Sequence, residues 1–276
     1  MGKSHKYFQT SNMRKTITVF FVMGFCLFFA GNNVSADEAR ALMEKVERER
    51  SNSGEIEEMN MSLLDSQGNV RMRTVTYYNK QKKPGSKEDM RLVRFHSPAD
   101  MDGSGVLTIE NNDRDNDQWM YSPAYHTTRR VPPSNRGNRY MGTDYAYEDI
   151  MDQKTHEYEY AIIGKETMNG IPCTLLQSVP IEPKLVKETK YSKTLWWIDP
   201  VRHITAQIDF FDKSGNLFKR MSTAQLKPYG NHWRFDKVTI EDFSRNHKTV
   251  NEIIQRKIDQ EIPDYYFTER FLKREK

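Results

Sequence analysis

Cysteine is scarce in this sequence, and neither cysteine nor histidine occurs in pairs at the spacing of a metal site. The two cysteines are Cys26 and Cys173, and Cys26 lies in an N-terminal apolar run. A chain without that run therefore has no internal disulfide, and we expect Cys173 to be a small core residue. The later histidines stand singly, so we predict no metal and no cofactor. They are His96, His126, His156, His203, His232 and His247.

Beyond residue 36 the chain has no net charge of one sign. The chain has 42 Lys and Arg residues against 38 Asp and Glu residues. Residues 1–36 hold four of the basic residues and no acidic one, which leaves 42 − 4 = 38 basic against 38 acidic residues in the remainder. A neutral chain lacks the basic footprint of a nucleic-acid-binding protein, so we predict no nucleic-acid partner.

No apolar run in the sequence reaches the usual length of a membrane-spanning helix. The run over residues 16–31 follows two basic residues and ends before small residues at 34–36. It is shorter than the ~20 residues of a membrane-spanning helix, and the small residues stand where a signal peptidase cuts. We predict a signal peptide over residues 1–36, cleaved near Ala36, and one domain over residues 37–276 in the periplasm. The alternative is an uncleaved membrane anchor.

Catalytic signatures of the common enzyme classes are also absent. The segment Gly103-Ser104-Gly105 lacks the third glycine of a dinucleotide loop and the spacing of a nucleophile elbow, so we expect a turn there. Acidic residues cluster between 144 and 152, and paired carboxylates can perform general acid–base catalysis. Helix capping or a solvated face explains the cluster more simply, and we predict that the protein is not an enzyme. The cluster comprises Asp144, Glu148, Asp149 and Asp152.

What is present is one helical pattern followed by many strand patterns. Ala39, Leu42, Met43 and Val46 recur at helical spacing and predict an amphipathic helix over residues 37–50. Short, evenly spaced strands with almost no helix between them favour an antiparallel sandwich or barrel over βαβ units. Two hairpins with the same turn chemistry are expected, at 59–63 with 70–78 and at 204–210 with 217–221. Further strands are expected near 91–95, 106–110, 118–121, 127–131, 157–163, 173–181, 193–198, 233–240 and 249–258, and a short helical piece near 144–152.

The centre of the chain carries the most distinctive motifs. They are Ser97-Pro98, Gly105-Val106-Leu107, Trp119-Met120-Tyr121-Ser122-Pro123, Arg129-Arg130, Met141-Gly142-Thr143-Asp144, Tyr147-Glu148-Asp149 and Gly170-Ile171-Pro172-Cys173. In this order they resemble the LolA-like outer membrane lipoprotein-sorting protein family, over about residues 38–270. The resemblance implies a mainly β fold, a half-open antiparallel β-barrel with an N-terminal helix and a short helical lid. It also implies an apolar concavity that holds acyl chains in transit through the periplasm.

Three functions are considered for such a protein. The leading hypothesis is a non-catalytic periplasmic carrier that binds the acyl chains of a lipid or lipoprotein and moves them between membranes. The resemblance also implies, for some members, an association with large lipid-exporting pumps, so the alternative is an accessory subunit of an inner-membrane pump of the RND type. A weaker alternative is a hydrolase that uses the carboxylates between 144 and 152.

Methionine and aromatic residues supply the candidates for an acyl-chain groove. Flexible, polarizable thioethers suit a surface that must fit varied chains, although they also fill gaps in ordinary cores. We expect the apolar hairpin face and the central segment to line either a groove or a closed core. The groove candidates are Met59, Met61, Met72, Trp119, Tyr121, Met141, Tyr145, Ile208 and Phe210.

The segment 140–152 is the candidate gate of that groove. Its apolar residues would face inward, and Gly142 would serve as the hinge because glycine tolerates backbone angles that other residues avoid. A guanidinium can bind a carboxylate with two donors. We therefore expect Arg130 to pair with Asp144 or Asp149 as a latch, or else to meet an anionic head group.

Overall fold

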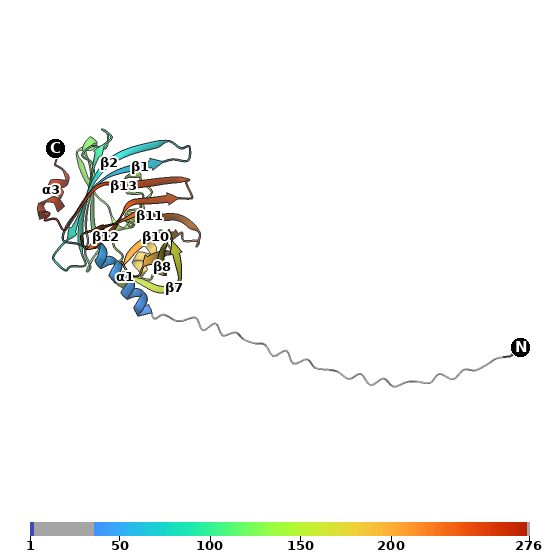
Figure 1. The fold of residues 1–276 in the computed structure, drawn as a ribbon. Coiled ribbons are helices and arrows are strands. Elements are labelled where there is room, and N and C mark those ends of the chain that lie inside the picture. The colour runs from blue at the N-terminus through green and yellow to red at the C-terminus, as the bar shows by residue number, and fades with distance from the viewer. Residues whose placement is uncertain (3–35, 275–276) are drawn as a thin grey trace. The chain divides into compact units, whose positions relative to one another are not determined.

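A curved antiparallel sheet forms the body of the protein (Figure 1). The computed structural model describes residues 1–2 and 36–274. Within them thirteen strands form one sheet. They are β1 (Glu55–Leu64), β2 (Val70–Gln81), β3 (Asp89–Ser97), β4 (Gly105–Ile109), β5 (Asp117–Ser122), β6 (Thr127–Arg130), β7 (Tyr158–Met168), β8 (Ile171–Pro180), β9 (Lys193–Asp199), β10 (Ile204–Phe211), β11 (Leu217–Tyr229), β12 (His232–Asp242) and β13 (His247–Ile258).

Helices are few and short in the described part of the chain. The α-helices are α1 (Ala36–Arg50), α2 (Pro183–Glu188) and α3 (Glu269–Leu272). None of the helices described here is long and apolar enough to span a membrane. The predicted signal peptide falls on residues outside the described ranges, apart from residues 1, 2 and 36, and stays a prediction. Single 3₁₀ turns are η1 (Pro123–Tyr125), η2 (Pro133–Asn135), η3 (Tyr140–Gly142), η4 (Thr155–Glu157) and η5 (Asp264–Phe267).

The strand order shows that the barrel is open. The strands follow the order β6-β5-β4-β3-β2-β1-β13-β12-β11-β10-β9-β8-β7, so β6 and β7 are the two edges of the sheet. All described pairings are antiparallel. This confirms the mainly β fold and the half-open antiparallel barrel that the sequence predicts.

The same order brings the centre of the chain to the inside of the sheet. Neighbouring strands follow one another in the sequence except β1 and β13, so the chain builds one half of the sheet out to β6 and then builds the other half back from β7. Residues 131–157, which we call the crossover, connect the two edges. Tyr140 and Tyr147 of the crossover pack with Met59 and Met61 of β1. We call the sheet face that carries these two methionines the inner face.

The crossover is not helical between residues 144 and 152, so the prediction of a short helical piece there is wrong. A single 3₁₀ turn, η3, precedes this stretch, and Met141 and Gly142 have positive φ angles of 47° and 77°. The next backbone N–H groups bind elsewhere: that of Ala146 donates to Asp149 Oδ2 at 2.5 Å and that of Tyr147 to the carbonyl of Asn138 at 3.1 Å. Side chains and a distant carbonyl thus accept the bonds that a helix would make internally.

Both predicted hairpins form, with the same turn chemistry. In the β1–β2 turn, Asp65 Oδ1 accepts the N–H groups of residues 67 and 69 at 2.9 Å each. In the β10–β11 turn, Asp212 Oδ1 accepts those of residues 214 and 216 at 2.9 Å each. The glycine in each turn, Gly68 or Gly215, has a φ angle of 84° or 83°, which side chains disfavour. Short polar side chains that bind their own backbone therefore end these strands, as the sequence predicts.

Helix α1 packs on the inner face at the half of the sheet that follows the crossover (Figure 1). Ala39, Leu42, Met43 and Val46 are its buried residues, as the helical spacing predicts. They join a core cluster with Tyr160, Leu176, Tyr191, Trp196, Ile198, Ile208 and Phe210. Acidic residues in the first turn and basic residues in the last turn complement the helix dipole.

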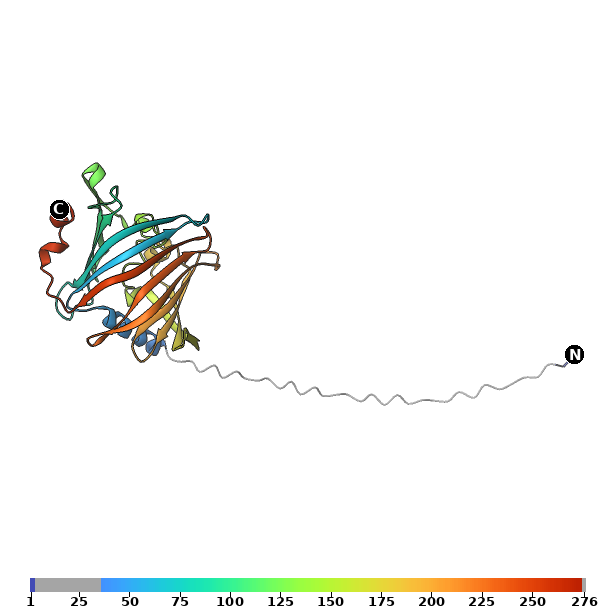
Figure 2. The same cartoon turned by 45° about the horizontal axis from the view of Figure 1, so that its top comes forward.

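The C-terminal segment covers the opposite, outer face of the sheet. Ile262, Phe267 and Leu272 pack there with Leu92 and Leu107 of β3 and β4. The guanidinium of Arg94 in β3 donates to the carbonyl oxygens of residues 271 and 272 at 2.7 and 3.2 Å. Figure 2 shows α3 outside the curved sheet, away from α1.

Candidate functional site

A cavity of about 340 Å³ lies on the inner face of the sheet. Residues of β1, β2, β3 and β9 to β13 line it, together with the crossover and the end of α1. Its volume lies near the lower end of the roughly 300 to 1,000 Å³ of small-molecule sites. We call this space the interior cavity. Its lining divides into an apolar wall and a polar end, which differ in chemistry.

The apolar wall is built by strands whose inward positions are hydrophobic. Trp196, Ile208 and Phe210 are buried and pack against α1, while Met59 and Ile253 belong to the cluster under the crossover. Such a surface offers no hydrogen bonds from its aliphatic side chains and fits an apolar ligand by contact area alone. The full apolar wall comprises Met59, Trp196, Ile204, Ile208, Phe210, Met221, Val238, Ile240 and Ile253.

The polar end is built around Arg256 of β13. Its guanidinium contacts three carboxylates: Glu55 Oε1 at 3.1 Å, Glu57 Oε1 at 2.7 Å and Asp236 Oδ1 at 2.7 Å. Burial, and then the neighbouring Glu55 carboxyl, raises the pKa of Glu57 to about 7 against the opposing effect of Arg256. Glu57 therefore titrates near neutral pH. We call Glu55, Glu57, Asn79, Arg234 and Arg256 the polar end of the cavity.

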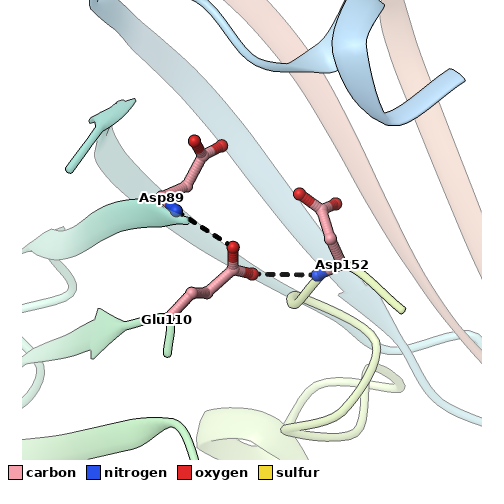
Figure 3. A group of neighbouring side chains, drawn as sticks. All are labelled: Asp89, Glu110 and Asp152. Carbon is pink, nitrogen blue, oxygen red and sulfur yellow. Dashed lines mark hydrogen bonds between the residues drawn. The ribbon is translucent and has the colours of Figure 1, made fainter. Parts of the chain in front are cut away.

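A second group of charges lies where β3 meets the crossover, and its members Arg50, Asp89, Arg91 and Asp152 also line the cavity. The backbone N–H groups of Asp89 and Asp152 donate to the two oxygens of Glu110 at 3.1 and 2.9 Å (Figure 3). The carboxyl groups of Asp89, Glu110 and Asp152 place one oxygen each within 4.8 Å of one another. The guanidinium of Arg91 pairs with all three, at 3.1 Å from Asp89 and 2.8 Å from Asp152. Arg50 of α1 adds a contact of 2.9 Å to Asp152.

These three carboxylates are better suited to arginine than to a metal ion. Three oxygens within 4.8 Å are a spacing that a cation can bridge. Arg91 is only 3 % exposed and lies among them, so a divalent cation there would be in contact with a buried guanidinium. Although burial alone would raise it, Arg50 and Arg91 hold the pKa of Asp152 below its usual value. We therefore interpret the group as a structural link between β3, the crossover and α1.

Three of the predicted groove residues line the interior cavity. They are Met59, Ile208 and Phe210. Met61, Met141 and Tyr145 lie beside it in the cluster where the crossover packs on the sheet. These six residues share the inner face or cover it, which agrees with their predicted orientation toward a common interior. Whether they contact a ligand stays a prediction.

Three other predicted groove residues point to the outer face, and their assignment is corrected. Met72 is 57 % exposed and pairs with Ser62, so it points away from Met61. Trp119 and Tyr121 pack under the C-terminal segment with Leu107. The cause is the two-residue period of a strand, since a residue at an odd offset from an inward one points outward.

The predicted latch between Arg130 and the acidic cluster does not form. Arg130 lies on the outer face, where its guanidinium contacts Asp117 Oδ1 at 2.6 Å. Asp144 instead contacts His247 Nδ1 at 2.7 Å and Thr249 Oγ1 at 2.7 Å, and Asp149 pairs with Lys219. Gly142 has the predicted positive φ angle, but its function as a hinge stays a prediction.

The acidic cluster between 144 and 152 is also divided among separate partners. Asp144 binds β13, Asp149 binds β11, and Asp152 pairs with Arg91 of β3. Glu148 accepts the backbone N–H of Lys190 at 3.3 Å. Each carboxylate thus holds the crossover to a different part of the fold, and this use favours a structural function over general acid–base catalysis.

The inward charges of the polar end were not predicted from the sequence. A signal for them was present, because Glu55 and Glu57 continue the alternation of Met59, Met61 and Leu63 by two residues at a time. The strand begins at Glu55 rather than at Met59. Arg256 had no local signal, since its partners Glu57 and Asp236 lie 199 and 20 residues away.

Comparisons with known proteins agree with this architecture. A family model described as an uncharacterized protein matches residues 87–274. No curated protein matches the chain. Among solved structures, an outer membrane lipoprotein-sorting protein domain from Vibrio parahaemolyticus is similar with a TM-score of 0.79 and 22 % identity, over 87 % of this chain and 100 % of that one.

Two further solved structures share the fold. A DUF1329 family protein from Desulfovibrio piger has a TM-score of 0.79 and 26 % identity, over 86 % of this chain and 98 % of that one. A LolA superfamily protein from Nitrosomonas europaea has a TM-score of 0.65 and 17 % identity, over 84 % of this chain and 98 % of that one. These likenesses confirm the fold that the motifs of the central segment indicate.

Proposed function

Since this chain belongs to the family whose model matches residues 87–274, and its fold is that of LolA-like lipoprotein-sorting proteins, we propose that it is a carrier of acyl chains. The cargo is a lipid or the lipid part of a lipoprotein. The chains lie along the apolar wall of the interior cavity. The protein moves this cargo between membranes without a catalytic step.

The apolar wall on the inner face is the observation that carries this proposal. Burying an alkyl chain gains about 0.8 kcal/mol per CH₂ group, so a chain of ordinary length can be held without a covalent bond or a cofactor. The wall combines methionine, aromatic and branched aliphatic side chains, which together accept varied chains. Because β6 and β7 are separate edges of the sheet, no closed ring of hydrogen bonds surrounds the cavity.

The proposed location is the periplasm, reached with a signal peptide that is cleaved near Ala36. A carrier between two membranes must work in the aqueous space between them, and the basic and apolar order of the first residues suits export. An inner-membrane pump of the RND type remains a proposed partner that would load or unload the carrier. The accessory-subunit alternative differs in that no lipid leaves the pump with the protein.

The test is mass spectrometry of lipids extracted from protein that has been exported and purified without detergent. We expect one or more acyl lipids at near-stoichiometric amounts. Ile253→Trp fills the cavity and should reduce bound lipid at least ten-fold. Ile254→Trp is the matched control, because Ile254 is the next residue of the same strand and is 58 % exposed.

Two outcomes would contradict the carrier. Lipid-free wild-type protein that also takes up no lipid from vesicles would favour the accessory subunit. Equal lipid in both variants would mean that the chains lie outside the interior cavity. A thermal melt of each variant separates loss of binding from loss of folding.

A further inference from the structure

The polar end of the interior cavity holds more carboxylates than it can neutralise. Arg256 alone contacts Glu55, Glu57 and Asp236, at distances from 2.7 to 3.1 Å. Arg256 and these three acids are almost entirely removed from solvent, since the exposed fractions of their side chains are 4, 5, 13 and 4 %. One guanidinium therefore faces three buried acids.

The other cationic side chains near these acids are Arg234 and Lys227. Arg234 contacts Glu55 at 3.3 Å but also Glu49 at 3.4 Å. Lys227 contacts Asp236 at 2.7 Å from the exposed side. Four carboxylates thus face three cationic side chains, Arg256, Arg234 and Lys227, and of these three only Arg256 contacts Glu57. Burial, and then the neighbouring Glu55 carboxyl, raises the pKa of Glu57 to about 7 even though Arg256 lowers it.

Asn79 provides an independent observation at the same place. It lies opposite Glu55 in the β1–β2 pairing, so its side chain is on the inner face, and it is 3 % exposed. Its Oδ1 has no hydrogen-bond partner among the described residues. A buried acceptor without a donor is costly, and one that lines a cavity marks the place where a ligand can supply that donor.

We propose that the polar end binds a primary ammonium group of the cargo, with the alkyl chain of the same molecule along the apolar wall. This inference rests on the proposed function, which it extends from chain to head group. An ammonium carries three N–H donors and one positive charge. The donors match Asn79 Oδ1 and the carboxylate of Glu57, and the charge offsets the surplus acid. Glu55 contributes its charge, since its oxygens already accept from Asn52 Nδ2 at 2.7 Å and from the two arginines. An anionic head group would add to that surplus, and the arginines that could bind it are already paired.

The position of the site within the cavity supports this orientation. Along β1, Glu57 is followed on the inner face by Met59, which belongs to the apolar wall. Along β13, Arg256 is followed toward the apolar wall by Ile253, across a bulge in the pairing with β1. The change from charged to apolar lining thus occurs within one or two inward positions, which is the geometry that an amphiphile with a small head group requires.

The test compares three probes with the same twelve-carbon chain below their micelle concentrations: dodecylamine, 1-dodecylglycerol and dodecanoate. Isothermal titration calorimetry at pH 8 measures each dissociation constant. We expect wild-type protein to bind dodecylamine at least ten-fold more tightly than the other two. Butylamine, which has the same head group and a short chain, should bind at least 100-fold more weakly than dodecylamine. This separates a lipid amine from a soluble one.

Matched variants locate the preference. Glu57→Gln should reduce the preference for the amine to three-fold or less and leave 1-dodecylglycerol binding within two-fold of wild type. Glu58→Gln should behave as wild type, because Glu58 is the next residue of the strand and is exposed. Asn79→Leu, which has nearly the same shape and no acceptor, should weaken the amine several-fold. It serves as the second variant if Glu57→Gln folds poorly.

The outcomes distinguish this inference from the proposed function. Equal binding of the three twelve-carbon probes overturns the ammonium site and leaves the carrier in place. Tighter binding of dodecanoate than of dodecylamine also overturns it. Failure of every probe to bind overturns the carrier itself. Butylamine that binds as tightly as dodecylamine would make the site one for soluble amines.

Discussion

Asp149 of the crossover forms a buried ion pair with Lys219 of β11. Their side chains are 3 % and 4 % exposed, and both also contact the hydroxyl of Tyr191. Elsewhere in the crossover, Tyr140 and Tyr147 pack on the half of the sheet that contains β1 to β3. The crossover is thus fastened to both halves of an open barrel, so its ion pair helps to hold the halves in place around the interior cavity.

Asp149→Ala should therefore destabilise the protein by about 3 to 5 kcal/mol, because it leaves the Lys219 ammonium buried without its carboxylate. Unfolding in guanidinium chloride, followed by tryptophan fluorescence, measures the change. The control is Glu252→Ala, which breaks the exposed pair between Glu252 and Lys237 and should cost about 0 to 1 kcal/mol. If both variants lose only about 1 kcal/mol of unfolding free energy, the buried pair does not anchor the crossover to the sheet.

Arg130 and Asp144 should act independently. Arg130→Ala should cost less than about 1 kcal/mol, since its side chain is 56 % exposed. Asp144→Ala should cost about 2 to 4 kcal/mol, because it removes a fully buried carboxylate that binds His247 and Thr249. The double variant should lose the sum of the two to within about 0.5 kcal/mol. A coupling energy above 1 kcal/mol in the cycle would revive a latch between them.

Glu47 of α1 should make stability fall as pH rises. Burial, and then the neighbouring Asp152, raises the pKa of Glu47 from 4.5 to about 8. When folding raises the pKa of a carboxyl, its contribution to the stability of the folded protein is fully present below the pKa that it has in the unfolded chain. The contribution falls as pH rises above that value, and it is lost once the pH has passed the pKa of the folded state. Glu47→Gln keeps the neutral form at every pH. We expect it to match wild type near pH 4 and to be more stable by about 1 to 3 kcal/mol at pH 9.

Urea unfolding of wild type and Glu47→Gln at several values between pH 4 and pH 9 checks this. The control is Glu44→Gln on the same helix, which breaks the contact of Glu44 with the exposed Lys87 and should cost about 0 to 1 kcal/mol. A difference for Glu47→Gln that does not grow with pH would refute the assignment.

Leu272 should anchor the C-terminal segment to the outer face. It is fully buried against a cluster that includes Leu92, Leu107 and Tyr121. Leu272→Ala should cost about 2 to 5 kcal/mol through lost burial and the cavity left behind. Arg270→Ala, an exposed change in the same short helix, should cost less than about 0.5 kcal/mol. Differential scanning calorimetry of the two variants separates them, and equal melting temperatures would mean that the segment is not a structural part of the domain.

Local patterns in the sequence predicted most of the elements. The spacing of Ala39, Leu42, Met43 and Val46 located α1, and every predicted strand forms. The hairpin turns formed as predicted because their determinants lie within five residues of one another. An aspartate that accepts the following N–H groups and a glycine with a positive φ angle act without help from the rest of the fold.

The direction in which each side chain points was harder to predict from the sequence, even for strands that were predicted correctly. The size and apolar character of Met72 and Trp119 favour a position in the groove, but the two-residue period places both on the outer face. Conversely, the apolar alternation predicts a strand that begins at Met59, whereas β1 begins at Glu55, and the same two-residue period points Glu55 and Glu57 inward. The type of a residue was thus a poor guide to the face of the sheet on which its side chain lies, whereas the pairing register of the strands was a good one.

Only the tertiary structure decided which charges meet. Arg130 pairs with Asp117 across neighbouring strands, and Asp149 pairs with Lys219, 70 residues away. Periodicity and turn chemistry are short-range effects that a chain carries in its sequence, so the sequence by itself determined a helix followed by antiparallel strands. The partner of a buried charge depends on which side chains the curved sheet brings together after the crossover has passed inside it. These partners are set by the tertiary structure, and for this reason the polar end of the cavity could be identified only from the folded protein.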